Sequence, residues 1–553
     1  MAGRIVSADV CIVGAGPVGL TAAAELASRG WRVALLELRA RAQAPSVKSN
    51  HISARSMEIF RRLGVADKIR AQGLPDDFPN DGVFATRFTG KELTRFRMPC
   101  RRDRFNDDGY DDGNLPSPER AARVSQMYLE PVLMDFVTGM EGVQILNRTS
   151  FESFEQSEDS VCVHARSLDD DVQVTINCRF LIGADGGKSS VRKALGFKLE
   201  GDDNLTRARS RLIRAPQMLA LCGYPKAWMN WFYAGGSWSS AVAIDGRELW
   251  LFHCFIPPNM AFEDFDIDKG ILDALGVGTD FKYETVYNED WIGRRLVADR
   301  LRDHRVFICG DAAHLWVPYG GYGMNAGIAD ASNLAWMLDA VLRGWAPMRL
   351  LDAHELERKP VTEQVSRFAA NFVVNAQVAE AEVIDDDSPA GEEARRAYGV
   401  RLREAHLPSW VPSGLNFGYC YADSPIIAHD GAVPPPFTMG SYQPSTTPGS
   451  RVPHFWLADG RSLYDALGDR YTLLRFRPDA DVTPIVRAAA ERGVPLDVLD
   501  VHPGKEFDAS VYTQAFVLSR PDQHVAWRGE TAPEDALALI DRVRGASIEG
   551  PEH

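Results

Sequence analysis

Two glycine-rich turns, almost 300 residues apart, constrain the fold more than any other feature of the chain. The first, Gly14–Gly19, has the spacing Gly-x-Gly-x-x-Gly and follows the apolar segment 9–13. The second starts with Gly310–His314 after the apolar run 306–309, and continues through Pro318 and a predicted glycine-rich loop over Gly320–Gly327 into a helix. A strand, a glycine turn and a helix start in succession wrap backbone around a ligand. We therefore predict one site for a large cofactor, built from both turns.

The first turn predicts a βαβ unit over residues 8–37. Gly14 permits a tight turn, Gly16 lets backbone approach a pyrophosphate, and Gly19 lets the helix pack closely on the sheet. Glu37 ends the second strand, where a carboxylate accepts hydrogen bonds from an adenosine ribose. This is the pattern of a dinucleotide-binding fold.

Composition excludes several classes of function. The 553 residues are 45% hydrophobic and 25% charged with a net charge of −15, which argues against nucleic acid or an anionic membrane as the main partner. The eight cysteines are scattered without a Cys-x-x-Cys, which is typical of reduced thiols in a cytoplasmic enzyme. No apolar run is long enough for a membrane span.

We predict no metal site. The segment Asp108–Glu119 approaches a calcium-loop pattern, but Tyr110 stands at position three of the loop, where aspartate or asparagine is needed, and Pro116 and Pro118 would disrupt the following helix. Ser-His-Asp hydrolase chemistry lacks a Gly-x-Ser-x-Gly motif.

A further motif lies between the two turns, so that it is the second motif along the chain and the Gly310 turn is the third. Gly183-Ala184-Asp185-Gly186 is followed by Ser189, Val191 and Arg192, a pattern that an ordinary capped helix also shows. Together, and in this order over about residues 8–360, the three motifs resemble those of the FAD-dependent aromatic hydroxylases, the class A flavoprotein monooxygenases. The last unit resembles the thioredoxin-like tail of the phenol hydroxylase branch. It contains no cysteine, so a packing or oligomer role is expected there, and a homo-oligomer is left open.

The resemblance implies an α/β fold with three domains. A Rossmann-like FAD-binding domain with a helical extension would comprise residues 1–75, 119–196 and 296–400. A β-rich, aromatic substrate domain would be interleaved with it at 76–118 and 197–295. A thioredoxin-like α/β domain over 440–553 would follow the proline-rich linker at 433–436.

The resemblance also assigns cofactor contacts, residue by residue. Lys48 stands where relatives often carry arginine; lysine keeps the charge but loses the bidentate fork, which puts direct phosphate binding there in doubt. Gly14, Gly16 and Gly19 are implied for the pyrophosphate and Glu37 for the ribose, and Asp185 lies in the motif that the family associates with both FAD and the nicotinamide cofactor. The further FAD contacts implied are Pro17, Leu38, Lys48, Arg123 and Gln126. Those implied for the ribityl chain and the flavin ring are Gly310, Asp311, Pro318, Gly321, Gly323, Met324 and Asn325.

The implied reaction is hydroxylation of a phenolic or related aromatic substrate. NADPH or NADH would reduce FAD, and a flavin C4a-hydroperoxide would pass one oxygen atom of O2 to the ring. A base or hydrogen-bond acceptor near the substrate would assist, and the candidates are His51, Tyr233 and His253, with Pro318 against the flavin. Each candidate could equally be a packed core residue. Trp228, Trp231 and Trp238 are compatible with the lining of an aromatic pocket and also with filling the core.

Two other functions are compatible with the same motifs. One is a flavin oxidase, dehydrogenase or reductase, and the other is a non-catalytic flavoprotein that sequesters a reactive intermediate. A flavin halogenase is disfavoured, because Trp228–Phe232 lacks the Ile-Pro that ends the tryptophan-rich motif of that family. The sequence does not identify the substrate or the nicotinamide preference.

Overall fold

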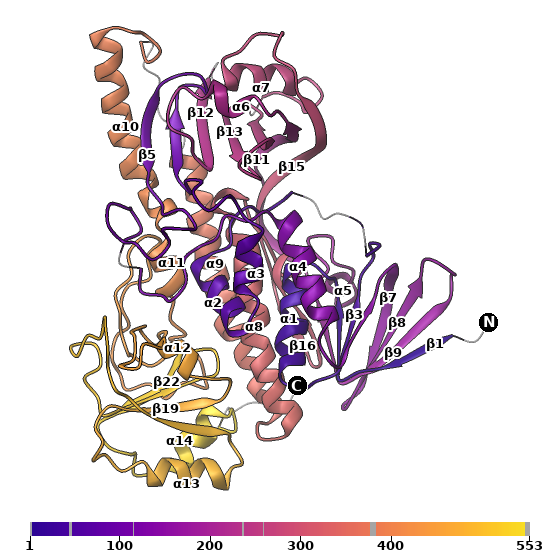
Figure 1. Cartoon of the computed structure of the whole chain (residues 1–553). Coiled ribbons are helices and arrows are strands. Elements are labelled where there is room, and N and C mark those ends of the chain that lie inside the picture. Colours follow the sequence, from indigo (N-terminus) through magenta and orange to yellow (C-terminus); the bar gives the residue numbers. More distant parts are fainter. Residues whose placement is uncertain are drawn as a thin grey trace.

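A computed structural model describes residues 3–41, 43, 47–113, 115–234, 237–257, 259–375 and 383–547. Its centre is a six-stranded sheet with the strand order β16-β17-β10-β2-β3-β6 (Figure 1). All neighbours pair in parallel except β16 and β17. The strands are β2 (Val10–Val13), β3 (Val33–Leu36), β6 (Val143–Leu146), β10 (Phe180–Gly183), β16 (Arg302–Asp303) and β17 (Val306–Ile308). Parallel strands bring their carboxyl ends to one edge, so the three glycine-bearing motifs meet there.

The helices packed on this sheet include α1 (Pro17–Ser28) and α8 (Tyr322–Arg343), which share one apolar core. A Cβ on Gly327 would lie 2.8 Å from the Cα of Gly310, so α8 and the end of β17 touch through bare backbone. The other helices of this region are α2 (Ala54–Arg62), α3 (Ala66–Ala71), α4 (Gln126–Thr138) and α5 (Ser190–Ala194), with η1 (Gly310–Ala312), η2 (Tyr319–Gly321) and η3 (Met348–Leu351).

Two helix starts differ from the sequence-based expectation. The sequence predicts a helix over Leu129–Thr138, opened by Glu130-Pro131, but helix α4 begins at Gln126 and Pro131 lies inside it. Helix α8 begins at Tyr322, so residues that were expected in a loop form its first turns. In both cases an extended or left-handed residue, Ser125 or Gly321, marks the actual boundary.

An eight-stranded sheet with the order β18-β15-β11-β14-β13-β12-β4-β5 forms the second layer of the molecule (Figure 1). Helices α6 and α7 share an apolar core with one face, and α9 and α10 with the other. The strands are β4 (Gly82–Ala85), β5 (Glu92–Phe96), β11 (Leu199–Arg214), β12 (Met229–Ala234), β13 (Ser237–Ala243), β14 (Leu249–Phe255), β15 (Glu284–Ala298) and β18 (His314–Leu315). The helices are α6 (Met218–Leu221), α7 (Ile267–Leu275), α9 (Asp352–Asn375), α10 (Pro389–Trp410) and α11 (Ser413–Phe417).

Two smaller sheets complete the fold. One has the order β1-β9-β8-β7 and lies at the right of Figure 1; its strands are β1 (Arg4–Ser7), β7 (Thr149–Gln156), β8 (Val161–Ser167) and β9 (Gln173–Cys178). The other, drawn in yellow, has the order β20-β19-β21-β22. Its elements are α12 (Leu463–Ala466), β19 (Tyr471–Arg475), α13 (Thr483–Glu491), β20 (Leu496–Asp500), β21 (Phe516–Ser519), β22 (Val525–Gly529) and α14 (Ala536–Val543).

Buried ion pairs join the C-terminal unit that contains this last sheet to helices α2 and α9 of the rest of the protein. Arg451 pairs with Glu58 of α2, and Arg520 pairs with Glu357 of α9, with all four side chains at most 1% exposed. Removing one partner of such a pair leaves an uncompensated buried charge, which is strongly destabilising. The C-terminal unit is therefore fastened to the helices behind the motifs. Within the described residues, no helix is long and apolar enough to cross a membrane.

Glu25 offers a test of the helical layer. This fully buried carboxylate on α1 accepts hydrogen bonds from Arg29, from Arg62 of α2 and from Ser332 of α8. Burial raises its pKa, but the charges of Arg62 and Arg29 outweigh burial and lower the pKa from 4.5 to about 2. At pH values above the ordinary pKa, the ionised form therefore stabilises the fold by about 3 kcal/mol. This stabilisation is lost as the pH falls toward 2.

We expect Glu25→Gln to lower the melting temperature by several degrees at neutral pH and to flatten its decline in acid. Thermal unfolding followed by circular dichroism across the acid range measures both effects. The control is Glu141→Gln, an exposed carboxylate in the turn before β6. Equal behaviour of the two variants would contradict the role of Glu25.

Candidate functional site

The first glycine turn is held by backbone contacts that only glycine permits. Gly14 has φ +103°, and a Cβ there would lie 2.4 Å from the carbonyl oxygen of Ala184 in the second motif. A Cβ on Gly19 would lie 1.9 Å from the oxygen of Gly14. At Gly16 a Cβ would meet nothing within 4 Å, so this residue faces open space at the N-terminus of α1, where Pro17 is the first helical residue. That N-terminus offers free N–H groups to an anion.

Glu37 is positioned at the end of β3 by the same turn. Its Oε2 accepts a hydrogen bond from Ala15 N at 2.9 Å, and its Oε1 accepts from Arg39 N at 2.8 Å. Burial raises the pKa of Glu37, but hydrogen bonds from Arg39 hold it below its ordinary value. Arg39 also donates to Glu130, which accepts from Gln126 at 2.6 Å. An ionic chain therefore links the predicted ribose position to Gln126, and Leu38, 59% exposed, lies beside it.

The second motif acts as a capped turn. The carboxylate of Asp185 accepts hydrogen bonds from Ser189 Oγ and from the N–H groups of Ser190 and Val191 at the start of α5. Arg192 donates to the carbonyl of Ala312 at 2.8 Å and so ties this turn to the third motif. A direct contact of Asp185 with a cofactor stays a prediction.

A buried carboxylate that we did not predict organises the third motif. Asp330 of α8 is 2% exposed; it accepts a hydrogen bond from His314 Nε2 at 2.8 Å and another from Arg358 Nε of α9 at 2.8 Å. Its Oδ2 also accepts from Gly310 N at 3.3 Å. Burial raises the pKa of Asp330, and the charges of Arg358 and His314 outweigh that effect and lower it. The sequence feature that could have revealed Asp330 is its position as an aspartate within an otherwise apolar helix.

Asp311 and Lys48 lie near each other although they are far apart in the chain. Asp311 is accessible to solvent but deep among protein atoms, and this burial raises the pKa of its carboxyl group. Positive charge at His314 and Lys48 opposes that rise. A Cβ on Gly323, in the first turn of α8, would lie 3.9 Å from Asp311 Oδ1. The carboxylate thus lies between a helix N-terminus and an exposed cation.

The start of α8 is fastened to the segment that holds His51. Gly320 and Gly321 have φ values of +73° and +68°, which favour glycine. The Asn325 amide donates to the carbonyls of His51 and Gly321, and its oxygen accepts from Ser53 N and Ser56 Oγ. Asn325 therefore positions the loop through its side chain.

The other residues predicted to contact the flavin ring lie around the start of α8. Pro318 is exposed at the head of the loop, Gly321 is partly buried beside His51, and Met324 packs against the central core.

His51 is a buried, neutral imidazole. Its Nδ1 contacts Arg123, whose guanidinium stacks over the ring of Trp228 at 4.0 Å. Burial, reinforced by the charge of Arg123, lowers the pKa of His51 well below its ordinary value. A ring in that state accepts a hydrogen bond from arginine and is a poor proton acceptor from a substrate.

The eight-stranded sheet presents an aromatic face toward α9 and α10. Trp231 stacks on Phe84 with centroids 6.1 Å apart and on Phe255 at 5.8 Å, and Phe255 meets Trp291 edge-on. Trp238 meets Phe84 edge-on. Phe84 and Trp231 share one core with Val317 and Tyr322 of the glycine-rich loop. The side chain of Tyr233 lies outside the described residues.

His253 belongs to the same face, because it pairs across the sheet with Ser240 and Ser210. Trp291 Nε1 donates to Ser210 Oγ at 2.7 Å, and Ser210 Oγ lies 2.6 Å from His253 Nδ1. Since Trp291 donates to the serine oxygen, the serine proton is available to Nδ1, and in that tautomer Nε2 carries the N–H of the imidazole. Burial lowers the pKa of His253 to about 4.

A cavity enclosing about 460 Å³, part of it open to solvent, lies beside the start of α8. Trp316, Tyr322, Val365, Tyr419 and Arg55 are among the residues that line it. Trp316 stacks on His314 at 4.6 Å, so the cavity adjoins the network of Asp330. In the described part of the chain, no group of three or more His, Cys, Asp or Glu side chains is placed to hold a metal ion.

Comparison with known proteins agrees with this geometry. Residues 7–369 match the family described as FAD binding domain, and residues 445–546 match the aromatic-ring hydroxylase C-terminal family. The chain is 32% identical to the FAD-dependent monooxygenase apdD of Emericella nidulans, over 98% of this chain and 90% of that protein. It is 28% identical to phenol 2-monooxygenase of Pseudomonas sp., over 99% and 94%.

Among solved structures, the rebeccamycin biosynthetic enzyme RebC with reduced flavin superposes with a TM-score of 0.87 at 33% identity, covering 98% of this chain and 100% of that one. Each of the three covers nearly the whole chain, so the likeness includes all the layers described above. The chain therefore belongs to the phenol hydroxylase-like family of FAD-dependent aromatic hydroxylases, and it is an FAD-dependent monooxygenase that acts on aromatic or phenolic substrates.

Proposed function

We propose that the enzyme hydroxylates a phenolic ring held between the aromatic face of the eight-stranded sheet and the loop 316–322, with O2 as oxidant. The observation that carries this is the shared core of that face and that loop. Val317 Cγ1 lies 3.0 Å from the position of a Cβ on Gly293 of β15, so the loop touches the sheet directly. Strand β18, at the head of the loop, also pairs with β15. A ring stacked on this face would lie next to the residues proposed for the flavin.

The described residues fit FAD. The open space at Gly16, at the N-terminus of α1, suits the pyrophosphate, and the Glu37 carboxylate suits the ribose hydroxyls. Asp311 and the backbone from Gly320 to Asn325 would hold the ribityl chain and the flavin ring. When bound, FAD supplies the redox chemistry, with NADPH or NADH as the reductant.

The first turn of α8 would contribute electrostatic stabilisation. Its free N–H groups point out of the helix start, where the helix dipole favours negative charge. The loop 316–322 also excludes water, because Val317 and Tyr322 are buried. Gly320 and Gly321 give the backbone the conformational freedom for the flavin ring to shift position.

His253 would orient the substrate by donating a hydrogen bond. Its pKa of about 4 makes it a weak base at neutral pH, while Ser210 directs its N–H to Nε2. A donor at this place stabilises negative charge on a phenolic oxygen as oxygen transfer proceeds. His51 instead positions Arg123 and the loop, since its ring nitrogen and its carbonyl are both engaged.

The domain division and the location in the cell are also part of the proposal. We infer that the sheet with order β20-β19-β21-β22 belongs to a thioredoxin-like domain, supported by one parallel pair beside two antiparallel pairs. The eight cysteines are all free thiols, which supports a cytoplasmic enzyme. A homo-oligomer is compatible with this assignment.

The proposed reaction is tested by NADH and NADPH oxidation across a panel of phenols, with products identified by mass. We expect substrate-stimulated oxidation and the gain of one oxygen atom in the product. Oxidation that yields only hydrogen peroxide with every phenol would favour an oxidase or reductase instead.

Gly16→Ala tests the pyrophosphate position. Because a Cβ there meets no protein atom, the apoprotein should keep its melting temperature. The same Cβ projects into the space assigned to the pyrophosphate, so FAD affinity should fall at least about tenfold, as measured by flavin fluorescence titration. Gly19→Ala is the contrasting variant, since its Cβ collides with Gly14 and should destabilise the apoprotein itself. Unchanged FAD affinity in Gly16→Ala would contradict the assignment.

His253→Phe tests the orienting donor. We expect product formation per NAD(P)H consumed to fall, and the hydroxylation rate to drop about tenfold, for the loss of one hydrogen bond to developing charge. His253→Gln keeps a side-chain N–H and should retain more of the rate. A hydroxylation rate that follows an ionisation near neutral pH in the wild type and loses it in His253→Gln would show a base instead.

A further inference from the structure

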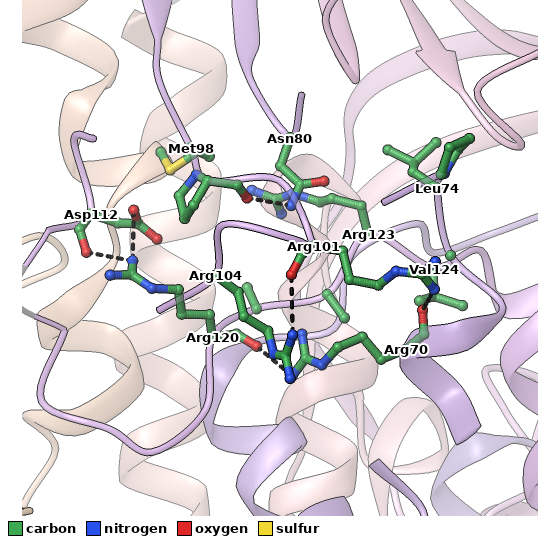
Figure 2. Close-up of a pocket in the computed structure, with 15 residues that line it drawn as sticks. Arg70, Leu74, Asn80, Met98, Arg101, Arg104, Asp112, Arg120, Arg123 and Val124 are labelled. Carbon is green, nitrogen blue, oxygen red and sulfur yellow. Dashed lines mark hydrogen bonds and ion pairs between the residues drawn. The ribbon is translucent and has the colours of Figure 1, made fainter. Parts of the chain in front are cut away.

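A second cavity lies between α3 and the segments around residues 98–124, and arginines surround it (Figure 2). It encloses about 500 Å³, part of it open to solvent. Asp112 is the one carboxylate among the described residues that line it, against five arginines: Arg70, Arg101, Arg104, Arg120 and Arg123. Leu74, Met98 and Val124 add an apolar part to the wall.

Three of the arginines are neutralised. Arg70 pairs with Glu119, and Arg101 pairs with Asp76. Arg120 pairs with both Asp107 and Asp112. Acidic side chains therefore compensate these cations within the protein.

Arg104 and Arg123 are placed differently, and Arg123 feels the carboxylates of Asp112 and Asp81 only at a distance. In the described residues neither forms an ion pair with a carboxylate; Arg104 donates to the carbonyl of Arg101 at 3.2 Å, and Arg123 contacts His51. The charge of Arg104 also lowers the pKa of nearby Arg70, so the cations repel each other. Burial lowers the pKa of Arg123 to about 10, but it stays charged at neutral pH. Cations without a direct ion-pair partner around one cavity favour an anionic ligand.

The position of Arg123 connects this cavity to the flavin loop. Its guanidinium is hydrogen-bonded to the ring of His51. The Cβ of His51 lies 3.2 Å from the position that a Cβ on Gly321 would take. The carbonyl of His51 accepts from Asn325 at 3.1 Å. An anion in the cavity is thus separated from the proposed flavin position by the Arg123–His51 pair. A ligand with a diphosphate at one end and an uncharged redox ring at the other fits this arrangement, with the diphosphate in the cavity and the ring toward the flavin.

We propose that this cavity binds the pyrophosphate of the nicotinamide co-substrate, through Arg104 and Arg123. The assignment rests on the proposed function in that NADH or NADPH is the reductant. Two guanidinium groups without a direct ion-pair partner can each bind one phosphate of a pyrophosphate, whereas a substrate carboxylate offers one anionic group.

Arg104→Gln is the principal variant, because Arg104 lies away from the proposed flavin contacts. Anaerobic stopped-flow reduction of the bound FAD should show a Kd for NADPH or NADH raised about tenfold, with the limiting reduction rate and the flavin content retained. Arg104→Lys should recover part of the affinity. Arg102→Gln, an exposed neighbouring arginine that does not line the cavity, is the matched control and should leave the Kd unchanged. Equal Kd values for Arg104→Gln and the wild type would overturn the proposal.

Inorganic pyrophosphate tests the ligand class without turnover. Calorimetric titration of the holoenzyme should detect binding that Arg104→Gln weakens, and pyrophosphate should compete with NAD(P)H. Competition with the phenol alone would assign the cavity to an acidic substrate, and equal binding of orthophosphate and pyrophosphate would indicate a site for free phosphate; either result overturns the proposal.

A single-turnover experiment separates this inference from the proposed function. Arg104→Gln enzyme reduced with dithionite and then mixed with O2 and a phenol should form product like the wild type. Loss of product there would move Arg104 from co-substrate binding to the oxygenation step and overturn the proposal. If wild-type enzyme hydroxylates no phenol, the proposed function fails, while the pyrophosphate titration still decides the cavity.

Discussion

The buried carboxylate of Asp330 is the interaction on which the arrangement of the site depends. It joins His314 and the N–H of Gly310 in the third motif to Arg358 of α9, through one helix side chain. An ionised carboxylate in this place is stable only because three donors surround it. The loop 316–322 and the start of α8 follow directly from this anchor, so their position relative to the central sheet is set by a single buried charge.

Close backbone packing supplies the second constraint. Glycines lie at the points where the turn after β2, helix α1, the second motif and the start of α8 meet. At Gly14, Gly19 and Gly327 a Cβ would be too close to the neighbouring element. Such contacts transmit position without side-chain freedom. The aromatic face of the eight-stranded sheet then adds a wall from strands that are separated along the chain, and buried ion pairs with the C-terminal unit hold α2 and α9 from behind.

The local structure of the glycine motifs could be predicted, because its signals are local. The glycine spacing at Gly14–Gly19, the carboxylate at Glu37 and the strand-turn-helix at Gly310 depend on residues that are close in the chain. The start of α8 was placed too late, since glycines in a first turn read as loop. The anchoring roles of Asp330 and Asn325 could not be predicted, although Asn325 was a predicted site residue, because their hydrogen-bond partners lie on other elements.

The sequence by itself determined the class of cofactor, the order of the motifs and the family, since each rests on short-range patterns of glycine, acid and apolar residues. Only the tertiary structure decided which polar groups are engaged and which are free. Asp185 caps a helix, the ring of His51 contacts Arg123, and the ring of His253 contacts Ser210. The same holds for the arginine-lined cavity, where Arg104 and Arg123 lack the acidic partners that their neighbours have. Charge compensation is a property of positions in space, so a linear sequence does not display it.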